Sequence, residues 1–183
     1  MRKSIAFCSL LLLAVVSVHA QEHSSATTAR PPSVTNTGSW VKLDSDEGRF
    51  SVLLPELAKD QVETQNSAKG PYTTHLFMAR NTKGVFLVGW VDYDPSFNFG
   101  VQSELEANRD NFVKGVNATL LNSNRITLNG NPGLEFTAET PQTTFKSRVY
   151  IIGKRPYQLI AGTYKGQDNS DEVARFFASF EVR

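Results

Sequence analysis

The chain has 183 residues, of which 40% are hydrophobic and 20% charged, with 19 Lys and Arg against 18 Asp and Glu. If Arg2 and Lys3 leave with a targeting segment, 17 basic residues remain against 18 acidic ones, a formal net charge of about −1. This balance argues against a nucleic-acid partner, which would favour a basic stripe.

The first segment, residues 1–20, is predicted to be an export signal peptide. A positive start at Arg2 and Lys3 precedes an apolar run from Ile5 to Val18 and a small-residue cleavage site ending at Ala20. About fourteen apolar positions are too few to cross a bilayer comfortably. We therefore expect a secreted or periplasmic protein with no transmembrane segment in its mature chain.

The mature chain is expected to begin near Gln21 and to carry no thiol, since Cys8 is the only cysteine and lies inside the signal. Secreted eukaryotic domains often carry disulfides, so their absence favours a bacterial source. Residues 21–38 are Ser, Thr, Ala and Pro with almost no large apolar side chain, a composition typical of a flexible leader. Residues 39–183 are predicted to form one domain.

Strand patterns open this domain. Trp40–Leu43 and Arg49–Leu54 are predicted strands joined by the turn Asp46-Glu47-Gly48, and Pro55 is expected to end the second. Tyr72–Arg80 and Val85–Tyr93 are predicted to form a hairpin whose second strand is central. The polar stretch from Pro55 to Gly70 is left unassigned.

A helix and a long meander follow. Val101–Lys114 is predicted to be helical, with Val101, Leu105, Asn108 and Phe112 on one face and Gly115 ending it.

The stretch Arg125–Tyr164 alternates with the period of two that half-buried strands show. Asn129-Gly130 predicts a tight turn that Pro132 and Gly133 widen. A two-residue connection at Pro141-Gln142 sets Leu134 opposite Val149 and Glu135 opposite Arg148.

The second turn of the meander is predicted at Gly153–Pro156, and both faces of the strand Tyr157–Tyr164 are expected to be covered. The last helix has Val173, Phe176, Phe177 and Phe180 at helical spacing behind a cap at Asn169 or Ser170.

Turn and core residues of the chain resemble those of PsbP-like domains. The matching positions are Trp40, Glu47–Val52, Leu54-Pro55, Asn131–Phe136, Arg148–Tyr150, Tyr157 and Phe176–Phe180. The resemblance covers nearly all of Trp40 to Val182. It implies an α+β fold, an α/β/α sandwich with a central antiparallel sheet. In the photosystem II member the domain is a non-catalytic partner of a larger complex, although none of that protein's binding residues can be matched here.

Candidate metal ligands are few. His75 is the only histidine of the predicted domain, so zinc would have only carboxylates as further ligands. Asp92 and Asp94 at a strand end, and the acidic turn Asp44–Glu47, are interpreted as capped turns. We therefore expect no metal site, no cofactor and no catalytic residue, and little effect on folding when Asp92 and Asp94 are both replaced by Asn.

Four aromatic residues, Trp90, Tyr93, Phe97 and Phe99, are candidate ligand-binding residues, although core packing explains them as well. The preferred hypothesis is an exported non-catalytic interaction or assembly module that binds a protein partner. One alternative is a small carrier of an apolar ligand, and a less favoured one is a metal-dependent hydrolase.

Overall fold

Two antiparallel sheets and two helices form the described part of the chain, residues 33–37, 40–67 and 70–183 of a computed structural model. The strands are β1 (Ser33–Thr37), β2 (Trp40–Ser45), β3 (Phe50–Leu54), β4 (Lys59–Ser67), β5 (Gly70–Arg80), β6 (Gly84–Tyr93), β7 (Thr119–Leu128), β8 (Asn131–Glu139), β9 (Thr143–Ile152), β10 (Arg155–Tyr164) and β11 (Glu181–Val182). The helices are α1 (Val101–Gly115) and α2 (Ser170–Ala178). The strand orders are β1-β2-β3-β11 and β4-β5-β6-β10-β9-β8-β7.

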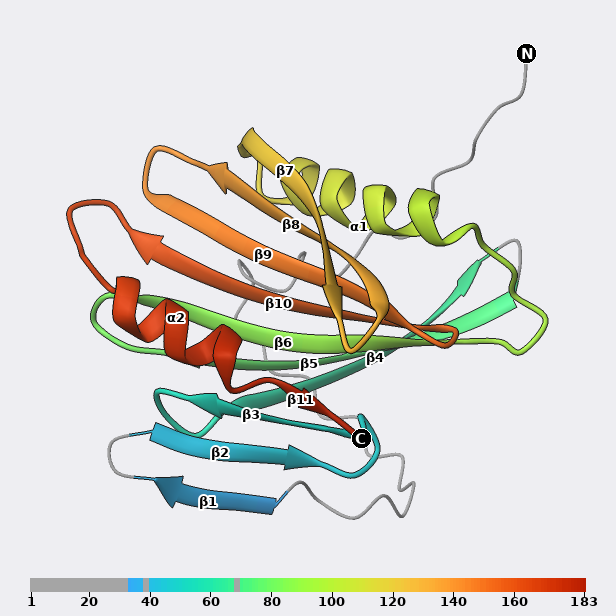
Figure 1. The fold of residues 1–183 in the computed structure, drawn as a ribbon, viewed down its shortest axis with the longest axis horizontal. Coiled ribbons are helices and arrows are strands. Elements are labelled where there is room, and N and C mark those ends of the chain that lie inside the picture. The colour runs from blue at the N-terminus through green and yellow to red at the C-terminus, as the bar shows by residue number, and fades with distance from the viewer. Residues whose placement is uncertain (1–32, 38–39, 68–69) are drawn as a thin grey trace.

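The seven-stranded sheet carries helices and the smaller sheet beside it (Figure 1). Each of its faces has a hydrophobic core. On one face α1 supplies Leu105 and Phe112 to the core. On the other, α2 packs together with the four-stranded sheet, which supplies Trp40 and Phe50. The α+β class and the antiparallel sheet agree with the sequence, whereas the small second sheet that shares a layer with α2 was not predicted.

The central meander has the predicted register. Leu134 pairs with Val149 and Glu135 with Arg148. Asn129 and Gly130 have φ angles of 50° and 79°, so both occupy the left-handed region that a type I′ hairpin requires. The expectation that Pro132 and Gly133 widen this turn was wrong, because both lie inside β8 and pair with β7. Pairing with β9 begins only at Gly133, so the missing N–H of Pro132 removes no bond on that side.

The second turn of the meander is shorter than predicted, since Arg155 and Pro156 already pair with β9. Only Gly153 and Lys154 form the connection, with Gly153 at a φ of 64°. β10 lies between β6 and β9, and its residues from Pro156 to Gly162 are buried. The prediction that this strand is covered on both faces is confirmed.

The N-terminal half of the domain differs in two places. Lys59–Ser67, left unassigned from the sequence, forms β4, an edge strand with mostly exposed side chains and no buried face to give an alternating pattern. Ser33–Thr37, within the predicted leader 21–38, forms β1 and pairs with β2. The predicted signal peptide and the rest of the leader lie outside the described residues.

Both predicted helices form. Leu105, Asn108 and Phe112 of α1 are buried, whereas Val101 is 41% exposed and Glu104 unexpectedly takes a buried position. Phe176 and Phe177 of α2 are buried against the sheet. None of the described helices is long and apolar enough to cross a membrane.

The N-terminus of α2 is capped differently from the prediction. Asn169 is the N-cap residue, but its side chain makes no capping bond and instead accepts a hydrogen bond from Thr163 Oγ1 at 2.6 Å. Asp168 Oδ1 accepts bonds from the backbone N–H and the hydroxyl of Ser170, at 3.0 and 2.8 Å.

Candidate functional site

The four predicted ligand-binding aromatic residues divide between the two faces of the large sheet. Trp90 is 1% exposed and belongs to the core under the small sheet. Tyr93, an odd number of residues further along β6, faces the opposite side and stacks on Phe97 at 4.3 Å. Phe99 meets Tyr93 edge-on at 5.5 Å. The structure therefore brings Tyr93, Phe97 and Phe99 together and places Trp90 apart.

The three grouped aromatic residues pack the loop before α1 onto the sheet. Phe97 is only 4% exposed, and the Tyr93 hydroxyl donates to Glu104 Oε1 at 2.7 Å. This bond gives the buried Glu104 carboxylate a partner. These contacts describe a folded loop, and ligand binding by the four residues stays a prediction.

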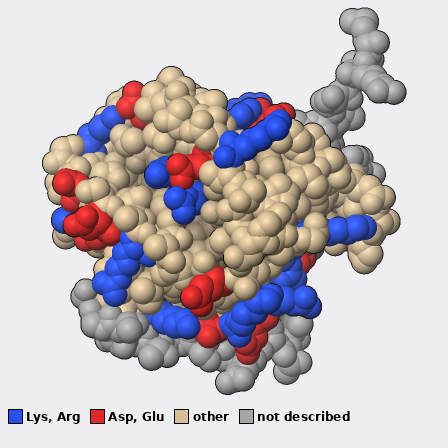
Figure 2. Space-filling model, viewed as in Figure 1, with Lys and Arg blue, Asp and Glu red and all other residues tan. Residues whose placement is uncertain are grey.

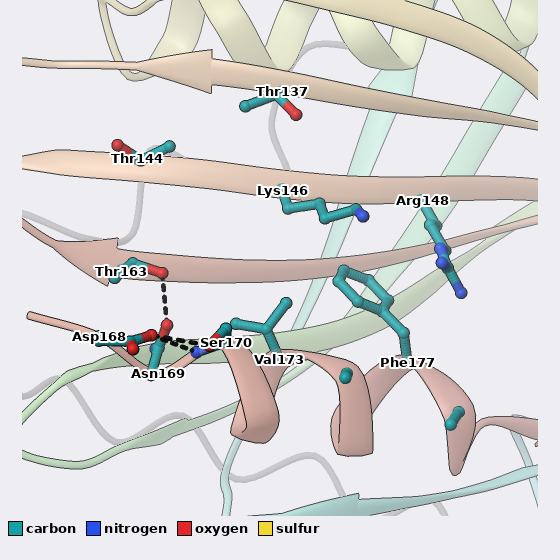
Figure 3. Close-up of a pocket in the computed structure, with 12 residues that line it drawn as sticks. Thr137, Thr144, Lys146, Arg148, Thr163, Asp168, Asn169, Ser170, Val173 and Phe177 are labelled. Carbon is teal, nitrogen blue, oxygen red and sulfur yellow. Dashed lines mark hydrogen bonds between the residues drawn. The ribbon is translucent and has the colours of Figure 1, made fainter.

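A groove of about 550 Å³ with both polar and apolar lining lies beside α2, over the strands that α2 leaves uncovered (Figure 3). Its floor comes from β8, β9 and β10, and its wall from α2 and the residues before it. The lining residues are Thr137, Thr144, Lys146, Arg148, Thr163, Asp168, Asn169, Ser170, Val173, Ala174, Phe177 and Ala178.

Three charged side chains from the meander meet at this groove. Glu135 accepts a 2.7 Å bond from Arg148 Nε and lies 3.3 Å from Lys146 Nζ. The Arg148 guanidinium also sits over the Phe177 ring, 4.6 Å from its centroid. Burial opposes ionisation of Glu135, but Arg148 and Lys146 outweigh it and lower the pKa of its carboxyl. Two cations thus share one carboxylate.

The other end of the groove is the start of α2. Asp168 is exposed, and its bonds to Ser170 lower the pKa of its carboxyl. Asn169 is buried, and its Nδ2 has no hydrogen-bond partner among the described residues. A Cβ atom on Gly84 would lie 2.2 Å from the Gly162 carbonyl oxygen and 2.8 Å from that nitrogen, so the close approach of β10 and Asn169 requires a glycine there.

The sequence predicted the charge pairing in this groove but not the groove itself. Lys146 and Arg148 were placed opposite Thr137 and Glu135, as the register confirms, and were interpreted only as register-setting pairs. The missing information was the position of α2. The sequence signal that could have indicated a groove is the charged face of β9, because a helix that covers only part of such a face leaves its charges open to solvent.

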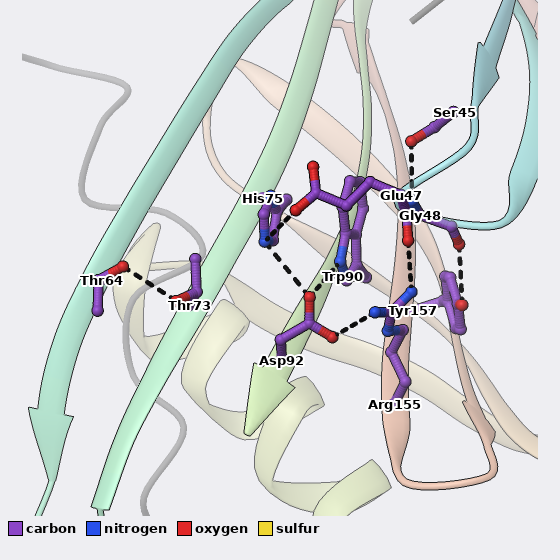
Figure 4. Close-up of polar contacts among 10 residues, drawn as sticks. All are labelled: Ser45, Glu47, Gly48, Thr64, Thr73, His75, Trp90, Asp92, Arg155 and Tyr157. Carbon is purple, nitrogen blue, oxygen red and sulfur yellow. Dashed lines mark hydrogen bonds and ion pairs between the residues drawn. The ribbon is translucent and has the colours of Figure 1, made fainter. Parts of the chain in front are cut away.

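A second cluster lies where the turn between β2 and β3 meets β5 and β6 (Figure 4). His75 pairs with Trp90 across the two strands and stacks on its ring at 4.2 Å. Its Nε2 atom lies 3.4 Å from Asp92 Oδ2 and 3.9 Å from Glu47 Oε1. The ligand atoms of the three residues all lie within 4.8 Å of one another.

Asp92 is held by several donors. Trp90 Nε1 donates to its Oδ2 at 2.9 Å, and Arg155 lies 2.6 Å from its Oδ1. Burial raises the pKa of this carboxyl, but the contacts with His75, Trp90 and Arg155 together lower it below its usual value. Arg155 also donates to the backbone carbonyl of Glu47 at 2.7 Å, which ties the turn to β10.

This geometry corrects the interpretation of the acidic turns. Asp92 and Asp94 were both interpreted as parts of a capped turn, yet the pairing of β5 with β6 brings His75 to Asp92. Asp94 instead accepts from the backbone N–H of Ser96 at 2.9 Å, as a capped turn should. In the turn between β2 and β3, the Ser45 hydroxyl rather than an Asp side chain accepts from the Gly48 N–H, at 2.9 Å.

Charged side chains on the face seen in Figure 2 form small groups of mixed sign. No continuous basic stripe crosses the described part of this face.

Comparison with known proteins shows the fold. No protein-family model and no curated protein matches the chain. Among solved structures, the chain is similar to the solution structure of cyanobacterial PsbP from Synechocystis, with a TM-score of 0.53 and 8% identity over 87% of this chain and 98% of that one. The PsbP-like fold predicted from the sequence is thereby confirmed.

A crystal structure of a protein from Bacteroides thetaiotaomicron aligns with 74% of this chain and 45% of that one, at 16% identity and a TM-score of 0.38. A match at this score supports no argument about the fold.

Proposed function

We propose that this protein is an exported, non-catalytic accessory module that binds a segment of a protein partner in the groove beside α2. The observation that carries the proposal is the sharing of Glu135 by Lys146 and Arg148 in an open groove. A carboxylate from a partner would complete the pairing of the second cation. Charge-assisted bonds of this kind are among the stronger polar contacts at an interface.

The walls of the groove suit a polypeptide. Val173, Ala174 and Phe177 offer apolar surface from α2, while Thr137, Thr144 and Thr163 offer hydroxyl groups from the sheet. An extended acidic segment combines carboxylates, backbone hydrogen-bonding groups and apolar side chains, and so matches both walls. The PsbP-like fold supports an accessory role only by analogy, since a fold hosts many functions.

The chemistry of the lining supports a non-catalytic role. Its lining residues include hydroxyl groups, Lys146 and Asp168, but no histidine and no cysteine, the side chains that most often activate or serve as a nucleophile. Ser170 donates its hydroxyl hydrogen to Asp168 at 2.8 Å, within the cap of α2. Export rests on the predicted signal peptide.

The test is a pull-down from the envelope fraction of the source cell with the mature protein as bait. We expect one or a few proteins to be retained by the parent and lost with Lys146→Glu, which places a negative charge beside Glu135. Lys154→Glu, on the turn between β9 and β10, is the matched control and should retain them. Retention by Lys146→Glu equal to that by the parent would refute the groove as the binding surface.

A second candidate function, a carrier of a small apolar ligand, is favoured by one observation. A pocket of about 220 Å³ beneath α1 is lined by Val85, Leu87, Phe112, Val116, Phe145 and Ile160, with Arg80, Thr143 and Tyr164 also contributing. Arg80 would bind an acidic head group while the apolar side chains hold a short tail. Calorimetric titration with hexanoate tests it, and heat that disappears with Arg80→Gln would support the carrier over the interaction module.

A further inference from the structure

The geometry points to a Zn²⁺ site formed by Glu47, His75 and Asp92, separate from the groove proposed for partner binding. The three residues come from the turn between β2 and β3, from β5 and from β6, and their ligand atoms converge (Figure 4). One imidazole nitrogen with two carboxylate oxygens is a donor set that zinc accepts in proteins. Water would take the fourth position, on the side of the exposed Glu47.

The spacing of the donors favours a metal over a direct ion pair. A charge-assisted N–H···O bond is about 2.7–2.9 Å long, and Arg155 and Trp90 meet Asp92 at 2.6 and 2.9 Å. The His75 Nε2 atom, by contrast, stands 3.4 Å from Asp92 and 3.9 Å from Glu47. Zinc bonds of about 2.0–2.2 Å in a tetrahedron give donor separations of about 3.3–3.6 Å.

The distance from His75 to Asp92 therefore already fits a zinc tetrahedron, and the distance from His75 to Glu47 is only a few tenths of an ångström longer. Glu47 is exposed, so its side chain can make this adjustment without disturbing the core. His75 and Asp92 are held more firmly, since one stacks on Trp90 and the other is bonded to Trp90 and Arg155.

The surroundings hold one of the three ligands, Asp92, in place for a metal. Trp90 donates to the same Asp92 oxygen that faces His75, which orients the carboxylate and leaves its other lone pair for the metal. His75 is more than nine-tenths buried and aims Nε2 between the two carboxylates. A recess of about 340 Å³ borders Asp92, Arg155 and Tyr157, and the exposed Glu47 opens the cluster to solvent.

Zinc is preferred over calcium and magnesium because of the imidazole and the small number of donors. Calcium takes six to eight oxygen ligands, and magnesium requires near-octahedral oxygen coordination. Imidazole suits zinc and neighbouring transition metals.

The test is calorimetric titration of the mature protein, stripped with a chelator, with Zn²⁺ and separately with Ca²⁺. We expect one Zn²⁺ per chain and no Ca²⁺ binding in the same concentration range. Glu47→Gln and Asp92→Asn should each weaken Zn²⁺ binding by about tenfold to a hundredfold or more. Loss of an outer-shell contact alone has an effect of this size. Asp94→Asn, two residues along the chain, is the matched control and should bind as the parent does.

A second control separates this site from the chain terminus. His23 lies near the expected mature N-terminus, where it and the terminal amine are an alternative pair of zinc ligands. If zinc binds at Glu47, His75 and Asp92 instead, His23→Gln should leave the binding unchanged. Glu47→Gln changes an exposed side chain and keeps the test valid if Asp92→Asn proves unstable. No Zn²⁺ binding by the parent, binding that survives Glu47→Gln, or binding lost with His23→Gln would each overturn the proposal.

Failure here is distinguishable from failure of the groove. Lys146→Glu should leave Zn²⁺ binding unchanged, because Lys146 lies among the groove-lining residues rather than in the zinc cluster.

Discussion

Truncation of Phe176 to Ala should remove a fully buried aromatic contact between α2 and the sheet. Phe176 is 0% exposed and meets Phe86 edge-on with ring centroids 5.4 Å apart. Loss of a fully buried phenylalanine side chain costs about 3–5 kcal/mol. This is a large part of the roughly 5–15 kcal/mol that stabilises a domain.

The measurement is urea unfolding followed by far-UV circular dichroism. With a slope of about 2 kcal/mol per molar urea, a loss of about 4 kcal/mol lowers the midpoint by about 2 M. Leu57→Ala is the control, because this leucine is 64% exposed and its truncation should change stability by about 0.5 kcal/mol or less. A midpoint for Phe176→Ala within about 0.3 M of the control would refute the docking of α2 described above.

A double-mutant cycle identifies the partner. Combining Phe176→Ala with Phe86→Ala should show a coupling of about 0.5–1.5 kcal/mol, the range for an edge-to-face aromatic pair. Additivity within about 0.3 kcal/mol would mean that the two rings do not stabilise each other.

Three further outcomes follow from the described contacts and the sequence. Asp92→Asn should destabilise the protein most near neutral pH, because folding lowers the pKa of the Asp92 carboxyl. The stability that the ionised carboxylate adds is fully present above the unfolded pKa of about 3.9. It is lost as the pH falls through the folded pKa. Urea melts of parent and variant from pH 7 to pH 3 should therefore converge, and a constant gap would contradict this linkage. Gly133→Ala should lower the free energy of unfolding by about 1–3 kcal/mol in the same melts. The reason is that a Cβ would meet Tyr150 at 2.5 Å and the Val149 carbonyl oxygen at 2.7 Å. Unchanged stability would show that β8 and β9 separate easily. The intact mass of the secreted protein should correspond to a chain that begins at Gln21, and a mass that retains Cys8 would disprove the predicted cleavage.

The sequence predicted the meander well because each strand carries its own local evidence. Asn129-Gly130 tolerates positive φ angles, and the alternation of Leu134 and Phe136 with Glu135 sets which face is buried. Turn chemistry and a period of two were sufficient to place Glu135 opposite Arg148. No long-range information was needed for that register.

The two clusters could not be predicted in the same way, because their residues meet through tertiary packing. Glu47 and His75 are far apart in sequence and meet only because the turn between β2 and β3 folds over β5 and β6. The groove exists only once α2 is docked beside β9. β4 was missed for a related reason: an exposed edge strand buries no face, and so its sequence carries no alternation.

The pairing of β6 with β10 divides the large sheet into two halves joined at one seam. Gly84 of β6 lies opposite Thr163 of β10. Between these two strands the chain forms α1, β7, β8 and β9, so their pairing closes a long loop. The hairpins on either side close short loops and should form early, whereas the seam closes a long loop at a higher entropic cost. We expect the rate of folding to depend on this closure. The chain is also a natural candidate for division into two complementing fragments within the loop before α1.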